Sequence, residues 1–308
     1  MRILFLGAVD FSRHCLNEVV RCGGEVVAVL TLDRQAGQHH SDYADLRDPA
    51  GRFGIPVHTI RRINDADTVA LIRSLRPEVM LVFGWSQLLS KAVLEIPARG
   101  CIGAHPALLP KDRGRHPLIW PLVRGADRSG LTFFYLDDGA DSGDILWQRP
   151  FPITLEDDAG TLYEKIKGLA TEAIREFLPR MKEGNAPRQP QDHRQATYGR
   201  KRSEPDGEVR WERSTVETHN LVRALARPYV GAHTYVDGHK VVIWRSRPGE
   251  GPLPQGAEGA VPGTVVRQAE GGVDVRTGNG FLRIVDFEIS GDHVTLAAGT
   301  RLGLGPAR

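Results

Sequence analysis

Short apolar runs separated by helical patterns constrain the first part of this chain more than any other feature. The runs RILFL (2–6), EVVAVLT (25–31) and EVMLVF (78–83) are continuous rather than alternating, as in parallel strands that are buried on both faces. Apolar residues at helical spacing occupy 11–20 and 66–76 between them. This order predicts a doubly wound, mostly parallel α/β sheet covered by helices.

The chain changes character near residue 195. A helical pattern over 157–181 is followed by GNAPRQPQDHRQ (184–195), a polar segment with Gly and Pro that is typical of a linker. Short strand-like runs then alternate with turns, and Asp237-Gly238 indicates a hairpin. We therefore expect an α/β domain at 1–195 and a small β-barrel or sandwich at 196–308.

The composition excludes several classes of protein. Hydrophobic residues make up 41% and charged residues 25%, which is typical of a folded domain. The formal net charge is 40 − 38 = +2, so there is no charge-based case for nucleic acid or an acidic membrane. The apolar run at 2–6 is too short for a leader or a membrane span, and three cysteines do not make a disulfide framework. These features predict a soluble cytoplasmic protein with unbridged thiols.

Two short segments carry the candidate chemistry. His105 follows a strand-like run at 101–104, where doubly wound sheets place ligands, and its imidazole can take up a proton near pH 7. The segment LDDGADSGD (136–144) could supply a carboxylate that orients and stabilises this ring. The plain alternatives are a structural histidine and an Asx-rich turn. The aspartates are also suitable ligands for a divalent metal, but no second ligand cluster accompanies them.

Two further segments could contact ligands. PKDRGRHP (110–117) presents Lys111, Arg113 and Arg115, and cations beside a glycine suit a phosphate, although a solvated basic loop is the alternative. FGWSQLL (83–89) is an apolar loop after a strand, which suits the wall of an aromatic site or simple core packing. G-x-G-x-x-G, Walker A and G-x-S-x-G patterns are absent, which argues against dehydrogenases, P-loop proteins and α/β-hydrolases.

Together these segments resemble the formyltransferases that use 10-formyltetrahydrofolate. HPALLP (105–110) and LDDGADSGD (136–144) are similar to the two motifs of that family, and RILFLGAVDFS and GWSQLL also fit. The resemblance implies formyl transfer to an amine without a metal or redox cofactor. It also implies a Rossmann-like catalytic domain at 1–195 and a small OB-like β-barrel at 196–308.

The resemblance assigns roles to individual residues. His105 and Asp141 fall on the catalytic histidine and aspartate, whereas Gly103 replaces an asparagine that hydrogen-bonds the formyl oxygen. Losing one such donor could cost about 3 kcal/mol. His116 is our candidate replacement, with a backbone N–H or a water as the alternative. The pterin is expected between the 83–89 and 136–141 loops, against Phe83, Gly84, Trp85, Leu88, Leu136, Asp138, Gly139 and Asp141.

The expected acceptor is a nucleotide-linked amino sugar. PKDRGRHPLIW (110–120) and RALARPYVGAHTY (223–235) resemble segments of sugar N-formyltransferases. Lys111, Arg113 and Arg115 would bind its phosphates, and Tyr229 or Trp211 would offer a stacking face unless these rings belong to the barrel core.

Other acceptors stay open at this point. A methionyl-tRNA formyltransferase is the main alternative, supported by the basic stretch around 199–203 but not by the 33–54 loop, which mixes arginines with aspartates. A folate- or sugar-binding protein that has lost catalysis, because of Gly103, and a folate hydrolase are further alternatives. Small β-domains often help to form dimers, so a homodimer is an option. The sequence does not name the sugar, the nucleotide or the amine position, and does not show whether the 33–54 loop closes over substrate.

Overall fold

The computed structural model describes residues 1–33, 42–291, 294–303 and 305, which form two compact units. Each unit combines segments that are separated in the sequence. The first comprises Met1–Pro117, Arg128–Pro152 and Tyr163–Arg200. The second comprises Leu118–Asp127, Ile153–Leu162 and Lys201–Arg308.

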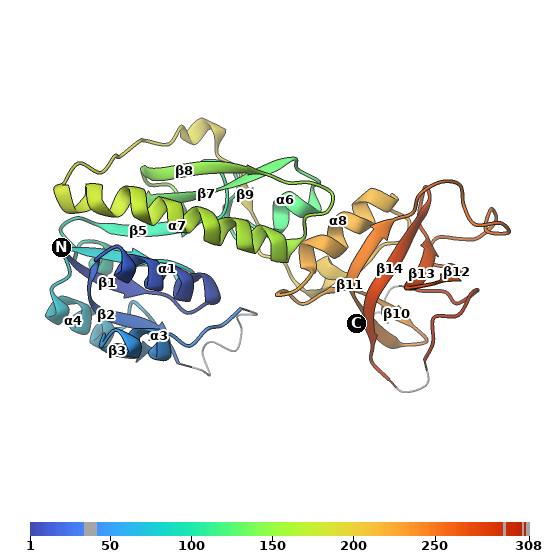
Figure 1. Cartoon of the computed structure of the whole chain (residues 1–308), viewed down its shortest axis with the longest axis horizontal. Coiled ribbons are helices and arrows are strands. Elements are labelled where there is room, and N and C mark those ends of the chain that lie inside the picture. The colour runs from blue at the N-terminus through green and yellow to red at the C-terminus, as the bar shows by residue number, and fades with distance from the viewer. Residues whose placement is uncertain (34–41, 292–293, 304, 306–308) are drawn as a thin grey trace. The chain divides into compact units, whose positions relative to one another are not determined.

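A seven-stranded sheet in the order β3-β2-β1-β4-β5-β7-β8 forms the centre of the first unit (Figure 1). The first five strands in that order are parallel, and β7 and β8 are antiparallel additions. This confirms the predicted doubly wound, mostly parallel sheet. The strands are β1 (Arg2–Leu6), β2 (Glu25–Leu32), β3 (Val57–Ile60), β4 (Val79–Val82), β5 (Cys101–His105), β7 (Arg128–Tyr135) and β8 (Ile145–Pro152).

Helices cover both faces of this sheet. On one face, side chains of α4 and α5 pack with Leu4, Leu6 and Met80 in a common apolar cluster. On the other face, Phe177 of α7 packs against Phe133, with ring centroids 5.1 Å apart. The 33–54 loop contains one short helix in its described part, while 34–41 lie outside the described residues. The helices are α1 (Asp10–Arg21), α3 (Arg47–Arg52), α4 (Ala66–Leu75), α5 (Lys91–Leu94) and α7 (Ala159–Glu183).

The first turn of α1 is held by Ser12, because the N-cap residue offers no side-chain hydrogen bond. Val9 occupies the N-cap position. The Ser12 hydroxyl instead accepts hydrogen bonds from the backbone N–H groups of Ala8 (3.1 Å) and Val9 (3.2 Å), and donates to the carbonyl of Phe83 (2.6 Å). Ser12 therefore ties the β1–α1 turn to the end of β4.

The second unit is built on a five-stranded antiparallel sheet in the order β10-β11-β14-β13-β12 (Figure 1). The predicted hairpin at Asp237-Gly238 joins β10 to β11. Gly303 bridges Tyr235 on β10, and Arg301 bridges Thr264 just before β12, so the C-terminal segment links both edges of the sheet. The elements are α6 (Ile119–Val123), α8 (Thr215–Leu225), β10 (Ala232–Val236), β11 (His239–Pro248), β12 (Val265–Ala269), β13 (Gly272–Arg276) and β14 (Phe281–Ile289).

The segment predicted as a linker is packed against the first unit. Gln189 exchanges backbone hydrogen bonds with Ile145 (2.8 and 2.9 Å), and the side chain of Gln191 is only 6% exposed. The two-residue strand β9 (Tyr198–Gly199) pairs with β6 (Arg113–Gly114). Polar composition is compatible with burial here because the backbone and amide groups find partners.

All three cysteines are free, and burial raises the pKa of the Cys101 thiol to about 12. Within the part of the chain that the structure describes, no helix combines the length and apolar character needed to cross a bilayer.

A buried aspartate links three strands of the second unit. The Asp274 carboxylate on β13 has no exposed surface. It accepts hydrogen bonds from Arg267 on β12 (2.7 Å) and from Arg283 on β14 (2.7 and 3.0 Å). Burial alone would raise the pKa of Asp274, but the hydrogen bonds from Arg283 and Arg267 outweigh it and hold the pKa below its ordinary value.

We expect Asp274→Asn to lower the free energy of unfolding at neutral pH by about 1–3 kcal/mol, because a charged acceptor is lost between two arginines. A carboxyl with a depressed folded pKa stabilises above its unfolded pKa, near pH ~4, and loses this contribution as the pH falls through the folded pKa. Urea unfolding across this range should therefore show wild type and variant converging in acid. Asp286→Asn, on the exposed pair with Arg227, is the control and should change stability little; equal effects would contradict the prediction.

Candidate active site

His105 and Asp141 meet at the carboxyl end of β5. His105 is the last residue of that strand and is buried. Its Nδ1 lies 3.6 Å from Oδ2 of Asp141, and its Nε2 lies 2.7 Å from the carbonyl oxygen of Asp112. A carbonyl only accepts, so Nε2 is the donor and Nδ1 faces the carboxylate. The 3.6 Å distance is too long for a hydrogen bond but suits charge stabilisation of a protonated ring.

The Asp141 carboxylate is fixed by a backbone donor from another loop. The N–H of Gly114 donates to Oδ2 of Asp141 over 2.7 Å. Asp112, His116 and Asp141 all adopt left-handed backbone conformations, with φ near +57°. Such conformations are uncommon for residues other than glycine and often mark functional loops.

The space beside Gly103 is filled by apolar side chains. Gly103 precedes His105 by two residues on β5, so both positions face the same side of the sheet. A Cβ at Gly103 would lie 2.7 Å from Cδ2 of Leu136 and 3.0 Å from Cε1 of Phe134. The structure therefore leaves no room for an asparagine side chain without movement of Leu136. The proposed substitute, His116, is half-buried, and its role stays a prediction.

One of the three expected phosphate ligands is buried. The Arg113 side chain is only 2% exposed. Its guanidinium donates to Gln191 Oε1 (2.7 Å) and to the Tyr198 hydroxyl (3.0 Å), so it is not available to a substrate. Lys111 and Arg115 are exposed. The sequence does not distinguish the three cations because they stand in one polar segment.

The expected pterin wall divides into buried and exposed parts. Phe83 is fully buried, with its ring packed against Phe133 (5.1 Å between centroids), so its predicted ligand contact is wrong for the side chain. Trp85 and Leu136 lie half-buried against the apolar cluster that contains Leu4, Leu6 and Met80, and Leu88 is 74% exposed. Gly84, Asp138 and Gly139 are at the surface or half-buried in the same two loops.

The two aromatic residues expected to stack on a nucleotide belong to the second unit and differ in exposure. Trp211 is 2% exposed and its Nε1 donates to Thr234 Oγ1 (3.1 Å). Its ring is therefore core, which corrects the expected stacking role. Tyr229 is half-buried, and its role stays a prediction.

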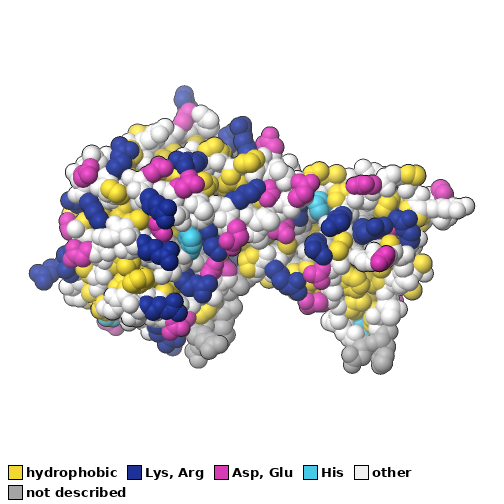
Figure 2. Space-filling model, in the orientation of Figure 1, with side chains coloured by type: hydrophobic (Ala, Val, Ile, Leu, Met, Phe, Trp, Pro, Cys, Tyr) yellow, Lys and Arg dark blue, Asp and Glu magenta, His cyan; other side chains and the backbone are white. Residues whose placement is uncertain are grey.

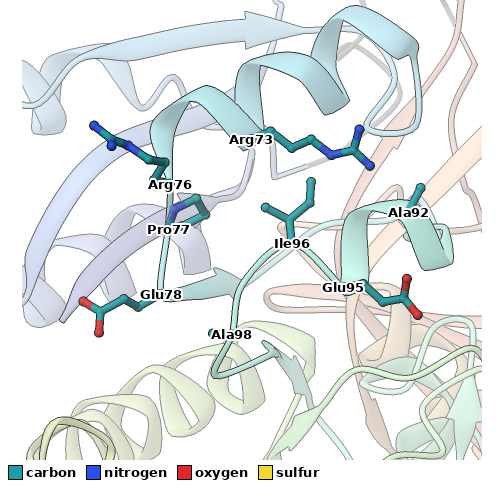
Figure 3. Close-up of a pocket in the computed structure, with 8 residues that line it drawn as sticks. All are labelled: Arg73, Arg76, Pro77, Glu78, Ala92, Glu95, Ile96 and Ala98. Carbon is teal, nitrogen blue, oxygen red and sulfur yellow. The ribbon is translucent and has the colours of Figure 1, made fainter.

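Metal-ligand clusters and pockets are other features that can mark a binding site. No group of three or more His, Cys, Asp or Glu side chains suited to a metal occurs among the described residues. A pocket of about 530 Å³ lies at the amino end of β4, away from the carboxyl end that carries His105 (Figure 3). Its lining mixes two arginines with two glutamates and comprises Arg73, Arg76, Pro77, Glu78, Ala92, Glu95, Ile96 and Ala98.

The fold and site define an α/β enzyme with a histidine–aspartate pair at a strand end, and comparison with known proteins supplies its family. Residues 1–178 match formyl transferase and residues 201–298 match the formyl transferase C-terminal domain. The chain therefore belongs to the formyltransferase family, whose members are transferases that use formyl-folate.

Individual relatives cover almost the whole chain. The methionyl-tRNA formyltransferase of Pelotomaculum thermopropionicum is 33% identical over 94% of this chain and 92% of its own. Among solved structures, HypX from Aquifex aeolicus in complex with tetrahydrofolic acid has a TM-score of 0.68 at 20% identity, covering 93% of this chain. This chain spans only 44% of HypX. The N-formyltransferase from Helicobacter canadensis, in complex with folinic acid and dTDP-3-aminofucose, has a TM-score of 0.65 at 15% identity, covering 92% of this chain and 98% of its own.

We expect Gly103→Asn to lower the free energy of unfolding by about 1–3 kcal/mol through overpacking against Leu136. Leu136→Ala should make room, so the double variant should be more stable than the sum of the two single effects predicts, by about 1 kcal/mol. Urea unfolding of the four proteins in this cycle measures the coupling. The control cycle uses Leu89→Ala, a residue of the same apolar cluster. Additive effects in both cycles would contradict the interpretation.

Proposed function

We propose that this protein transfers the formyl group of 10-formyltetrahydrofolate to an amine. The observation that carries the proposal is the His105–Asp141 pair at the end of β5, 3.6 Å apart. Its strand-end position is where open α/β sheets bind their ligands. The folate compounds named with HypX and with the Helicobacter canadensis enzyme support the choice of donor.

In the proposed reaction the neutral amine attacks the formyl carbon, so negative charge develops on the formyl oxygen and positive charge on the nitrogen. His105 is placed to take the amine proton, and the Asp141 carboxylate stabilises the resulting imidazolium. The Nδ1–H of the protonated ring can then hydrogen-bond the formyl oxygen, and its proton passes to the folate nitrogen as the bond between that nitrogen and the formyl carbon breaks. This gives His105 the largest share of the chemistry, because Gly103 offers no side-chain donor.

The apolar loop after β4 suits a flat pterin ring. Leu88 is 74% exposed and stands in this loop three residues after Trp85. Trp85 and Leu136 pack against the apolar cluster that contains Leu4, Leu6 and Met80. We propose that these side chains form the apolar part of the folate site, with the backbone around Asp138 and Gly139 near its polar edge.

For the acceptor, we propose a nucleotide-linked amino sugar. The run at 110–120 supports this choice, as does the aminofucose nucleotide named with the Helicobacter canadensis enzyme. Lys111 and Arg115 are exposed, although Arg115 donates one hydrogen bond to the Ser86 carbonyl (3.3 Å), and we propose that both cations bind the diphosphate. On the face shown in Figure 2, Lys and Arg side chains are interspersed with Asp and Glu, which is the charge pattern expected for a small substrate rather than a long polyanion.

Methionyl-tRNA is the second candidate acceptor, favoured by the name and full-length similarity of the Pelotomaculum thermopropionicum relative. The basic stretch around 199–203 would then contact RNA. Arg202 within it stacks on Trp120, with 4.9 Å between guanidinium and ring centroid, and donates to the carbonyl of Asp206. These contacts within the second unit already use this cation.

An acceptor panel tests the proposal directly. The purified protein is incubated with 10-formyltetrahydrofolate and either amino-sugar nucleotides or methionyl-tRNA, and the added formyl mass is measured on each. We expect a formyl adduct on a sugar nucleotide, and about 10²- to 10⁴-fold slower transfer by His105→Asn because its proton transfer is lost. His58→Asn on β3 is the control for loss of an imidazole.

The other outcomes of this panel are also informative. An adduct only on methionyl-tRNA would replace the proposed acceptor with the second candidate. Formate release without any adduct would indicate a hydrolase. Folate binding without turnover would indicate a binding protein and overturn the proposed reaction.

We expect Lys111→Ala and Arg115→Ala each to raise KM for a sugar nucleotide about 10-fold, equivalent to about 1.4 kcal/mol of lost phosphate interaction. KM for the folate and kcat should change little. The effect should shrink in high salt because both cations are exposed. Lys91→Ala on α5, an exposed lysine paired with Glu95, is the matched control, and an equal rise in that variant would show that the effect is only one of net charge.

A further inference from the structure

We infer that Gln191 and Arg113 are positioning residues that hold Asp141 beside His105. The catalytic consequence of this inference rests on the proposed function, whereas its structural content does not. Neither residue touches His105 or Asp141 side-chain atoms in the contacts described. Both act through the loops that carry the catalytic pair. From the sequence we expected Arg113 to bind phosphate, and we expected no role for Gln191.

The side-chain amide of Gln191 holds the loop that carries Asp141. Its Nε2 donates to the carbonyl oxygens of Asp141 (3.0 Å) and Gly143 (2.6 Å). One amide therefore fixes the backbone of the catalytic aspartate and of the residue two positions later. At Asp141 this backbone is left-handed, with φ +56°, a conformation that persists only where its surroundings enforce it.

Arg113 connects this amide to the loop that follows β5. Its guanidinium donates to Gln191 Oε1 from Nη2 (2.7 Å) and from Nε (3.3 Å). Further bonds reach the Tyr198 hydroxyl (3.0 Å) and His193 Nδ1 (3.2 Å). These acceptors are neutral, although a buried guanidinium is costly to desolvate. Such a group is expected to be rigid, because loss of any acceptor leaves a buried charge less well satisfied.

The same segment fixes the other contacts of the pair. Gly114, next to Arg113, donates its N–H to Asp141 Oδ2 (2.7 Å). Its φ of +94° and a position where a Cβ would lie 2.8 Å from the Gly199 carbonyl oxygen require glycine. Asp112, whose carbonyl accepts from His105 Nε2, donates its own N–H to Thr197 Oγ1 (2.8 Å). Both nitrogens of His105 are therefore aligned through residues held by the 191–199 segment.

Hydrogen exchange of the Gly114 amide reports this arrangement without any activity assay, because that N–H is hydrogen-bonded to the Asp141 carboxylate. We expect Gln191→Ala and Gln191→Glu each to accelerate its exchange, measured by NMR, at least about 10-fold. Asp141→Ala sets the scale for complete loss of the bond. Gln191→Glu keeps an acceptor for Arg113 and lacks the donor for the two carbonyls, so it separates loss of positioning from loss of folding. Gln195→Ala, an exposed glutamine of the same segment whose amide donates to Asp192, is the matched control and should leave exchange unchanged.

The kinetic test uses the acceptor identified by the panel. We expect Gln191→Glu to lower kcat about 100-fold, the loss expected for a displacement of about 1 Å, with KM for the folate within a factor of about 3 and a melting temperature near that of wild type. In an Asp141→Ala background the same change should lower kcat no further, because the group it positions is absent. Equal losses in both backgrounds, or unchanged Gly114 exchange in both Gln191 variants, would overturn the inference. Failure of wild type to formylate any amine would overturn the proposed function instead, and would leave the exchange result standing.

Discussion

The hydrogen bond from the Gly114 amide to the Asp141 carboxylate joins the two loops on which the candidate site depends. One loop follows β5 and the other follows β7, which pairs antiparallel with β5. Strand pairing alone does not bring these loops together, because Tyr135 at the end of β7 pairs with Ile102 near the start of β5. The loop after β7 must therefore run back along the sheet to place Asp141 beside His105. The short pairing of β6 with β9 and the buried amide of Gln191 supply the remaining restraints. The precision of the site thus comes from loop contacts built upon a rigid sheet.

Much of the fold follows from sequence patterns that report burial directly. The continuous apolar runs mark parallel strands because both faces of such strands are covered. Asp237-Gly238 marks a hairpin because its tight turn requires left-handed backbone. His105 could be placed at a ligand-binding edge for the same reason, since it directly follows a strand-like run. Its pairing with Asp141 depends on long-range packing, and it was the family resemblance that indicated it.

The remaining errors concern polar and aromatic residues whose burial depends on specific partners. Arg113 stands in the same segment as Lys111 and Arg115, and only the acceptors Gln191 and Tyr198 make its burial tolerable. Phe83 and Trp211 appear suitable for ligand contact in sequence, yet both rings are needed inside their own units. The polar residues at 184–195 suggested a linker, because composition does not show that the buried Gln191 amide is hydrogen-bonded to Arg113, Asp141 and Gly143.

The 191–199 segment has a practical consequence for the design of fragments of this protein. The two family matches end at residue 178 and begin at residue 201, so a fragment cut at the first of these limits would discard Gln191 and β9. Such a fragment would keep the sheet, His105 and Asp141, and would still lack the contacts that align them. Inactivity of that fragment would then reflect a missing tether within the first unit. A fragment that keeps these contacts must extend at least through Gly199, where β9 ends.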